Sequence, residues 1–82
     1  MENDRVRVLE FRGKAGDRTE MHSHPAVVAI GLTDGEYRFS SPGGPSMEIE
    51  MKAGDVVYMD AMEHATEVLG TGEARGFLVE LK

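Results

Sequence analysis

Hydrophobic and polar residues alternate along much of this chain with a period of two, which is typical of half-buried β-strands. The clearest examples run from Arg5 to Phe11, from Glu36 to Ser40 and from Met47 to Met51. Shorter runs of strand-forming residues cover 19–24, 26–32, 56–59 and 74–81, and Pro25 separates the first two of these. No stretch shows a convincing amphipathic helical spacing, so the pattern indicates an all-β fold.

Turn signals separate these runs at short intervals. Gly-rich or Pro-rich clusters at 13–17, 41–46, 52–55 and 70–73 predict turns, and Asp34-Gly35 predicts a tight hairpin with positive φ angles. The segment 60–69 is less regular: we expect a bend followed by a strand from about His64, although its Met, Ala and Glu residues also suit a helix. The whole pattern predicts a single domain, 1–82, of about eight short strands in a sandwich or barrel.

Composition narrows the functional classes. The chain has 82 residues, no cysteine and a formal net charge of −6. The missing cysteines exclude disulfides, thiolate metal sites and cysteine nucleophiles. The acidic balance, without any basic cluster, argues against nucleic-acid binding. The charged N-terminus does not resemble a signal peptide and no apolar run has the length of a membrane helix, so we expect a cytoplasmic protein that binds no membrane.

Three histidines are the candidate chemistry. His22 and His24 are two residues apart in an expected strand, so their side chains point to the same face. Two neighbouring neutral imidazoles suit a divalent transition metal, whereas a solvated histidine pair at a strand edge binds nothing tightly. His64 stands alone in the sequence, and a lone histidine can equally be an ordinary surface or core residue.

The spacing around these histidines resembles the first motif of the cupin superfamily. That motif runs Gly, five residues, His-x-His, three or four residues, Glu, six residues, Gly. Here Gly16 is followed by five residues and then His22-Ser-His24. With three residues in the gap, the glutamate position falls at Val28 and the final glycine at Gly35.

The second cupin motif is only partly kept. It runs Gly, five residues, Pro-x-Gly, two residues, His, three residues, Asn. Gly54 opens it and His64 is its histidine, one residue early, while Asp60, Met62 and Val68 replace the proline, glycine and asparagine. The resemblance covers about residues 5–82 and implies a small cupin-type β-barrel, or jelly roll, of antiparallel strands.

The resemblance also implies a metal site at the mouth of the barrel. Its ligands would be His22, His24 and His64, without a carboxylate because Val28 cannot coordinate. Such a site keeps open positions for water or substrate. The cofactor is expected to be a divalent transition metal: Fe, Mn, Ni, Zn or Cu.

Other residues near the site have lesser roles. Strict alternation points Glu63 and Glu67 away from the face of His64, as solvated or supporting groups, and Asp60 could coordinate only if a bend turned it inward. The residues expected to line the pocket are Val28, Met62, Tyr37 and Tyr58. No catalytic side chain can be assigned.

The sequence supports three functions. The first is a metalloenzyme, for example a dioxygenase acting on a small chelating substrate such as a diketone or enol. The second is a non-catalytic cupin that binds or senses a small ligand, and the third is a barrel that serves only for dimerisation. In each case we expect a homodimer that covers its sheet edges.

Overall fold

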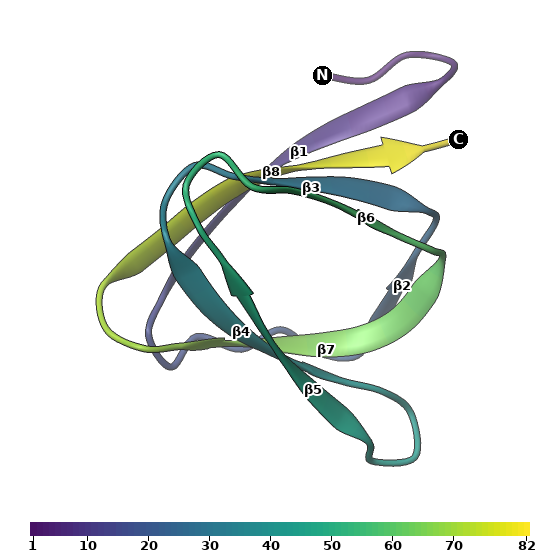
Figure 1. Ribbon diagram of the computed structural model, residues 1–82. Helices are drawn as coiled ribbons and strands as arrows, with labels where there is room; N and C mark the ends of the chain where they lie inside the picture. Colours follow the sequence, from purple (N-terminus) through teal and green to yellow (C-terminus); the bar gives the residue numbers. More distant parts are fainter.

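A computed structural model describes residues 1–82 and is all-β, as the alternation predicts. Eight strands form two four-stranded antiparallel sheets that face each other (Figure 1). The strands are β1 (Val6–Lys14), β2 (His22–His24), β3 (Val27–Gly31), β4 (Gly35–Ser40), β5 (Ser46–Met51), β6 (Val56–Met59), β7 (Met62–Leu69) and β8 (Glu73–Leu81).

The strand order places segments from both halves of the chain side by side. One sheet has the order β1-β8-β3-β6 and the other has the order β2-β7-β4-β5. The first and last long strands pair along their whole length, from Val6 opposite Leu81 to Lys14 opposite Glu73. This arrangement brings β2, which carries the histidine pair, onto the start of β7, which carries the third histidine.

One local prediction differs from the structure. Asp34-Gly35 does not form a hairpin, because β3 and β4 belong to different sheets and neither residue has a positive φ angle. Instead the chain crosses here between the sheets, and the Asp34 carboxylate accepts a hydrogen bond of 2.9 Å from the Ala53 backbone. The expected bend and strand are present in the segment 60–69: a bend at Ala61 precedes the strand of residues 62–69, which begins two residues before His64, and pairing with β2 and β4 overrides the helix-favouring composition.

The predicted turns at 41–46, 52–55 and 70–73 connect consecutive strands. Gly43, Gly54 and Gly70 have positive φ angles there, a conformation that strains other residue types. The connection at 41–46 joins β4 and β5 into a hairpin, which the sequence places correctly.

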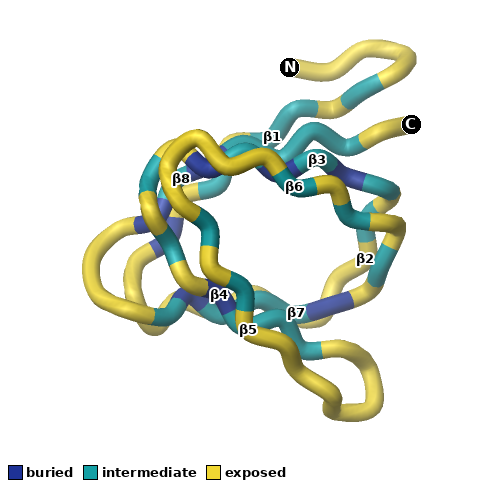
Figure 2. The backbone as a smooth tube through the Cα atoms, viewed as in Figure 1, coloured by how far each residue is buried: buried dark blue, intermediate teal, exposed yellow.

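Only a small group of side chains is fully buried. Tyr37, Val68 and Ala74 form the buried cluster, and Phe11 packs its ring edge-to-face on Tyr37 with 5.7 Å between the ring centroids. Buried positions lie along the inner side of both sheets, and the turns are exposed (Figure 2). His64 is the one buried polar or charged side chain, at 5% exposure. The inside of the fold therefore has an apolar core and a histidine site.

The structure contains no helix with the length and apolar character required to cross a bilayer.

Candidate metal centre

The pairing of β2 with β7 brings the three histidines together. His22 lies directly opposite His64 across the antiparallel ladder, and His24 lies one step along the same face. The ring centroids of His22 and His24 are each 4.8 Å from that of His64. One possible ligand nitrogen from each ring lies within 4.8 Å of the other two. Residues forty positions apart in sequence thus form one cluster.

Hydrogen bonds fix which ring nitrogens are free. Nδ1 of His22 donates to the Glu20 carbonyl at 2.8 Å, and Nδ1 of His24 donates to the Pro25 carbonyl at 3.1 Å. A carbonyl can only accept, so both rings carry their proton on Nδ1 and leave a lone pair on Nε2. This is the tautomer that a metal bound through Nε2 requires.

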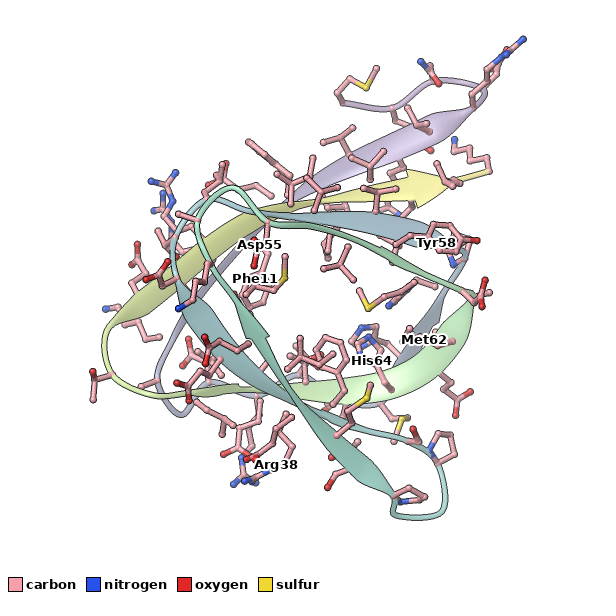
Figure 3. The ribbon with its side chains drawn as sticks, viewed as in Figure 1. Phe11, Arg38, Asp55, Tyr58, Met62 and His64 are labelled. Atoms are coloured by element: carbon pink, nitrogen blue, oxygen red, sulfur yellow. The ribbon has the colours of Figure 1, made fainter.

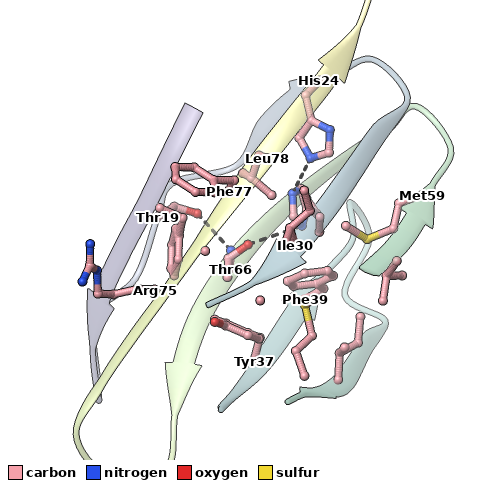
Figure 4. A pocket seen from close by; sticks show the side chains of 18 of the residues that line it. Thr19, His24, Ile30, Tyr37, Phe39, Met59, Thr66, Arg75, Phe77 and Leu78 are labelled. Atoms are coloured by element: carbon pink, nitrogen blue, oxygen red, sulfur yellow. Dashed lines mark hydrogen bonds between the residues drawn. The ribbon is translucent and has the colours of Figure 1, made fainter. Parts of the chain in front are cut away.

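The third ring meets the second nitrogen to nitrogen. Nε2 of His64 lies 2.8 Å from Nε2 of His24, so in the metal-free protein a single proton on His64 bridges the two (Figure 4). Two nitrogens bound to one ion at about 2.1 Å lie roughly 2.9–3.4 Å apart, which is close to this spacing. A divalent cation could therefore take the place of the bridging proton with little change in the rings.

Thr66 contacts His64, and Thr19 joins the segment before β2 to Thr66. The Thr66 hydroxyl lies 3.4 Å from Nδ1 of His64, a long contact that orients the ring weakly. The Thr66 amide donates to the Thr19 hydroxyl at 2.9 Å, and the Thr19 amide donates to the Thr66 carbonyl at 2.8 Å. The segment that precedes β2 is thereby held against β7, which positions the histidine pair opposite His64. Alternation along β7 puts Thr66 on the same face as His64, whereas nothing in the sequence indicates a role for Thr19.

Phe39 closes the site on the other side. Its ring packs edge-to-face on His64, with 4.7 Å between centroids. His64 points into the interior of the fold, whereas Arg38, the neighbour of Phe39 on β4, points to the outside (Figure 3). Burial, together with the positive charges that His24 and His22 would carry, lowers the pKa of His64 from 6.5 to about 4. The ring is therefore neutral near pH 7, as a metal ligand must be.

The structure changes the residue that we assign to the glutamate position of the cupin motif. Val28 points to the outer face of its sheet, in one row with Val79 and Tyr58. The next residue, Ala29, is 4% exposed and lines the same cavity as the histidines. The motif allows three or four residues in this gap, and the four-residue spacing is the one that the pleat of β3 selects. Both residues are apolar, so the centre still has no carboxylate from this strand.

The other candidate acids stay away from the histidines. Glu67 pairs with Arg38 at 3.3 Å and with Arg18 at 3.5 Å on the outside of the second sheet. Asp60 is not part of the histidine cluster, and its carboxylate lies beside the Tyr58 hydroxyl, where it raises the pKa of that tyrosine. Three imidazoles are thus the whole protein ligand set that the structure assembles.

A cavity of about 120 Å³ extends from the histidines between the two sheets. Of the residues expected to line it, Tyr37 does so, whereas Val28, Tyr58 and Met62 are not among its walls. Tyr58 is on the outer face of β6, and Met62, the first residue of β7, lies at the rim of the fold (Figure 3). The walls that sequence reasoning did not assign include Phe11, Ile49, Met51, Val57, Met59 and Leu78.

We expect the stability of the metal-free protein to depend on pH through His64. Between about pH 6.5 and pH 4 the unfolded chain binds a proton at this residue and the folded protein does not. The free energy of unfolding therefore falls as the pH falls through this window, by on the order of 2 kcal/mol, and is fully retained above it. Urea unfolding at pH 7 and pH 4.5 measures the change.

The matched variant for that measurement is His64→Leu, which lacks the titrating ring. The pH-dependent loss should be smaller in this variant by the same amount. An equal loss in both proteins would assign the acid sensitivity to other groups.

Comparisons with known proteins give one consistent result. No family model matches the sequence, and no curated protein matches it. Among solved structures, a cupin domain from Bordetella pertussis Tohama I is 26% identical, with a TM-score of 0.87 over 100% of this chain and 86% of that chain.

Two further structures share the fold at lower identity. An RmlC-like cupin family protein from Methanocaldococcus jannaschii is 16% identical, with a TM-score of 0.76 over 99% of this chain and 73% of that chain. An oxalate decarboxylase from Lactobacillus farciminis, in complex with formate, is 21% identical, with a TM-score of 0.70 over 95% of this chain and 24% of that chain. The jelly-roll arrangement of the strands and these structural neighbours together show that the chain has the fold of a small cupin.

Proposed function

We propose that this cupin is a metal-dependent enzyme that acts on a small chelating substrate, as a dioxygenase or a related oxidoreductase. The observation that carries the proposal is that His22, His24 and His64 come together at an apolar cavity. The Nδ1–H groups of His22 and His24 donate hydrogen bonds to backbone carbonyls, which leaves Nε2 of each ring free for a metal. Such a cluster would hold one ion of Fe, Mn, Ni, Zn or Cu and leave positions open for a ligand.

The protein's own contribution is to bind and orient. A bound ion would supply Lewis-acid or redox chemistry at its open positions. Three neutral imidazoles compensate none of its charge, so the site favours a substrate that chelates as an anion, such as an enolate. Glu63 and Glu67 lie on the outer side of β7, and no carboxylate lines the cavity, whose titratable residues are the histidines, Tyr37 and Arg75. The proposed chemistry therefore depends on the ion rather than on a protein general base.

The cavity limits the substrate by size and polarity. Its volume, about 120 Å³, is close to that of an engineered apolar cavity of ~150 Å³ that binds benzene. Arg75 is on a wall strand, but its guanidinium pairs with Glu10 at 3.5 Å on the outer face of the sheet. No cationic side chain thus faces a second carboxylate. We infer a substrate with one chelating end and an apolar body, rather than a dicarboxylate such as oxalate.

The alternative function is a non-catalytic cupin that binds or senses a small ligand. The absence of a carboxylate from the cavity walls favours it, because such a protein needs the metal and the cavity but no proton transfer. The two functions share the metal centre and differ only in whether the ligand is converted.

Oxygen uptake by the Fe(II)-loaded protein separates these functions. We expect consumption of dioxygen with short β-diketones such as pentane-2,4-dione, and none with oxalate. His64→Asn is the variant that should remove the uptake, and Ser46→Lys, on the outside of the same sheet, should keep it. A shift in the metal's absorption spectrum without uptake supports the binding function and contradicts catalysis. No spectral change with any diketone contradicts the proposed substrate class.

A further inference from the structure

One buried side chain of the cavity carries a polar group that the protein itself does not satisfy. Tyr37 is 8% exposed and lines the cavity, yet its hydroxyl makes no hydrogen bond within the chain. Burial alone raises the pKa of this phenol above its ordinary value of 10.0, and no bonded neighbour contributes. A buried tyrosine hydroxyl normally has a hydrogen-bond partner, so an unpartnered one points to a group that binds in the cavity.

The hydroxyl lies on the inner side of β4, at the end of the cavity away from the histidines. A Cβ atom on Gly35, two residues earlier on the same face, would lie only 2.7 Å from the Tyr37 oxygen and 3.2 Å from the Cβ atom of Ala74. Glycine at this position therefore leaves room for the hydroxyl. Phe39 separates Tyr37 from the metal centre, because its ring centroid is 6.5 Å from that of Tyr37 and 4.7 Å from that of His64. Figure 4 shows Tyr37 at the opposite end of the cavity from the histidines.

The other polar side chains on the cavity walls are already engaged. The Thr19 hydroxyl accepts from the Thr66 amide, and the Thr66 hydroxyl contacts the imidazole described above. Nε of Arg75 has no partner, but this side chain extends along the outer face of its sheet, where the guanidinium pairs with Glu10 at 3.5 Å. Tyr37 thus presents the unused polar group on the inner side of the walls.

A bound water is a poor partner for this hydroxyl. Buried waters are held where about two to four polar groups bond them. The side chains packed around Tyr37 are apolar: Phe11, Phe39, Met51, Val68 and Ala74. Gly35 and Ala74 also border a polar surface groove, but Tyr37 is a wall of the cavity and not of that groove. A ligand atom fits better than water, because the rest of the ligand holds it in place without further polar contacts.

We propose that the Tyr37 hydroxyl donates a hydrogen bond to a neutral oxygen, a ketone or an ether, at the far end of the bound ligand. The inference rests on the proposed function for the chelating end, and it adds a second polar point to the apolar body of that ligand. A phenol that keeps its proton at neutral pH is a donor and selects an acceptor. A neutral acceptor fits better than a carboxylate, since the guanidinium of Arg75 is on the outer face and no other cation lines the cavity. Tyr37 is in this way a specificity-determining residue.

Two cyclic probes of nearly the same shape test this contact: cyclohexanone, and methylenecyclohexane, in which a methylene group replaces the carbonyl oxygen. NMR titration measures their binding to the wild type and to Tyr37→Phe, with both the zinc-loaded and the metal-free protein. The wild type should favour the ketone over the hydrocarbon by roughly 3–10-fold more than Tyr37→Phe does, which is the contribution of one hydrogen bond. Tyr58→Phe removes a hydroxyl from the outer face instead and should keep the wild-type ratio.

The melting temperature of ligand-free Tyr37→Phe gives an independent readout. Removal of a hydroxyl that bonds to the protein destabilises the fold, whereas removal of an unpartnered one does not, so the variant should melt at the wild-type temperature or above it. A lower melting temperature overturns the proposal. So does an equal ketone preference in wild type and Tyr37→Phe, or a failure of both probes to bind near their solubility limits. The metal-free titration does not involve an ion, so a protein that keeps the ketone preference but binds no metal contradicts only the proposed function.

Discussion

Saturating metal should raise the melting temperature of this protein by roughly 10–20 °C. A ligand that binds only the folded state at a concentration 100 times its Kd stabilises that state by about 2.7 kcal/mol, and each kcal/mol shifts the melting temperature of so small a domain by about 4–8 °C. The unfolded chain keeps His22 and His24 close in sequence but separates them from His64, so it holds the ion poorly. Differential scanning calorimetry with and without Zn²⁺ or Mn²⁺ measures the shift.

Two controls accompany this measurement. One is the metal-free protein treated with chelator, and the other is the protein with added Mg²⁺, which prefers oxygen ligands. Neither condition should change the melting temperature. Equal stabilisation by Mg²⁺ would contradict an imidazole site and would indicate binding to surface carboxylates.

Replacing His64 by asparagine should weaken metal binding by more than about 100-fold, because even the loss of a group that only orients a ligand costs 10–100-fold in affinity. His64 is the ligand that links the second sheet's long strand β7 to the histidine pair, and it is almost completely buried. A two-histidine remnant on β2 would bind metal no better than exposed histidine pairs elsewhere. Isothermal titration of metal-free wild type and His64→Asn gives both affinities.

Glu63→Gln is the matched variant for this comparison. It changes the residue next to His64 on the same strand, but its side chain points to the outer face. Metal affinity should stay within a factor of about two of the wild type, since removal of a solvated charge changes the local field only slightly. If His64→Asn binds metal as tightly as the wild type, the result would contradict a three-histidine metal centre.

The fold was predictable because strand alternation and turn residues act locally. The segments 5–11, 36–40 and 47–51 alternate cleanly, and glycine-rich turns separate them, so strands with roughly correct bounds followed from the sequence. Asp34-Gly35 shows the limit of such local reasoning. The hairpin signal does not prevail, because the strands on either side of it pair with other partners: β3 with β6 and β8, and β4 with β5 and β7.

The metal centre was predictable as far as spacing determines it. His22 and His24 share a face in any strand, and the cupin resemblance linked them to His64, which the structure places directly opposite His22. The sequence alone did not determine which residue occupies the glutamate position of the cupin motif. A gap of three residues after His24 gives Val28 and a gap of four gives Ala29, and these two residues face opposite sides of β3. The pleat settles it at Ala29, which has too short a side chain to bind a metal.

The cavity walls could not be read from sequence for a different reason. Met59 and Leu78 face the interior because β6 and β8 lie on either side of β3, and this order depends on pairing between residues far apart in the chain. The same order makes Tyr58 an outer-face residue, although as an aromatic residue in an expected barrel it was assigned to the pocket. The pleat and register of each strand, rather than residue type, decide which side of a sheet a side chain faces.

The number of imidazole ligands on a bound ion is the most direct test of the central claim. X-ray absorption of the Zn²⁺-loaded protein at pH 7.5, prepared with one ion per chain, measures it. We predict three nitrogen ligands at about 2.0–2.1 Å with the outer-shell scattering of imidazole rings, and the remaining ligands from water. Two or fewer imidazoles, a protein carboxylate among the ligands, or a chain that retains no zinc would contradict the account.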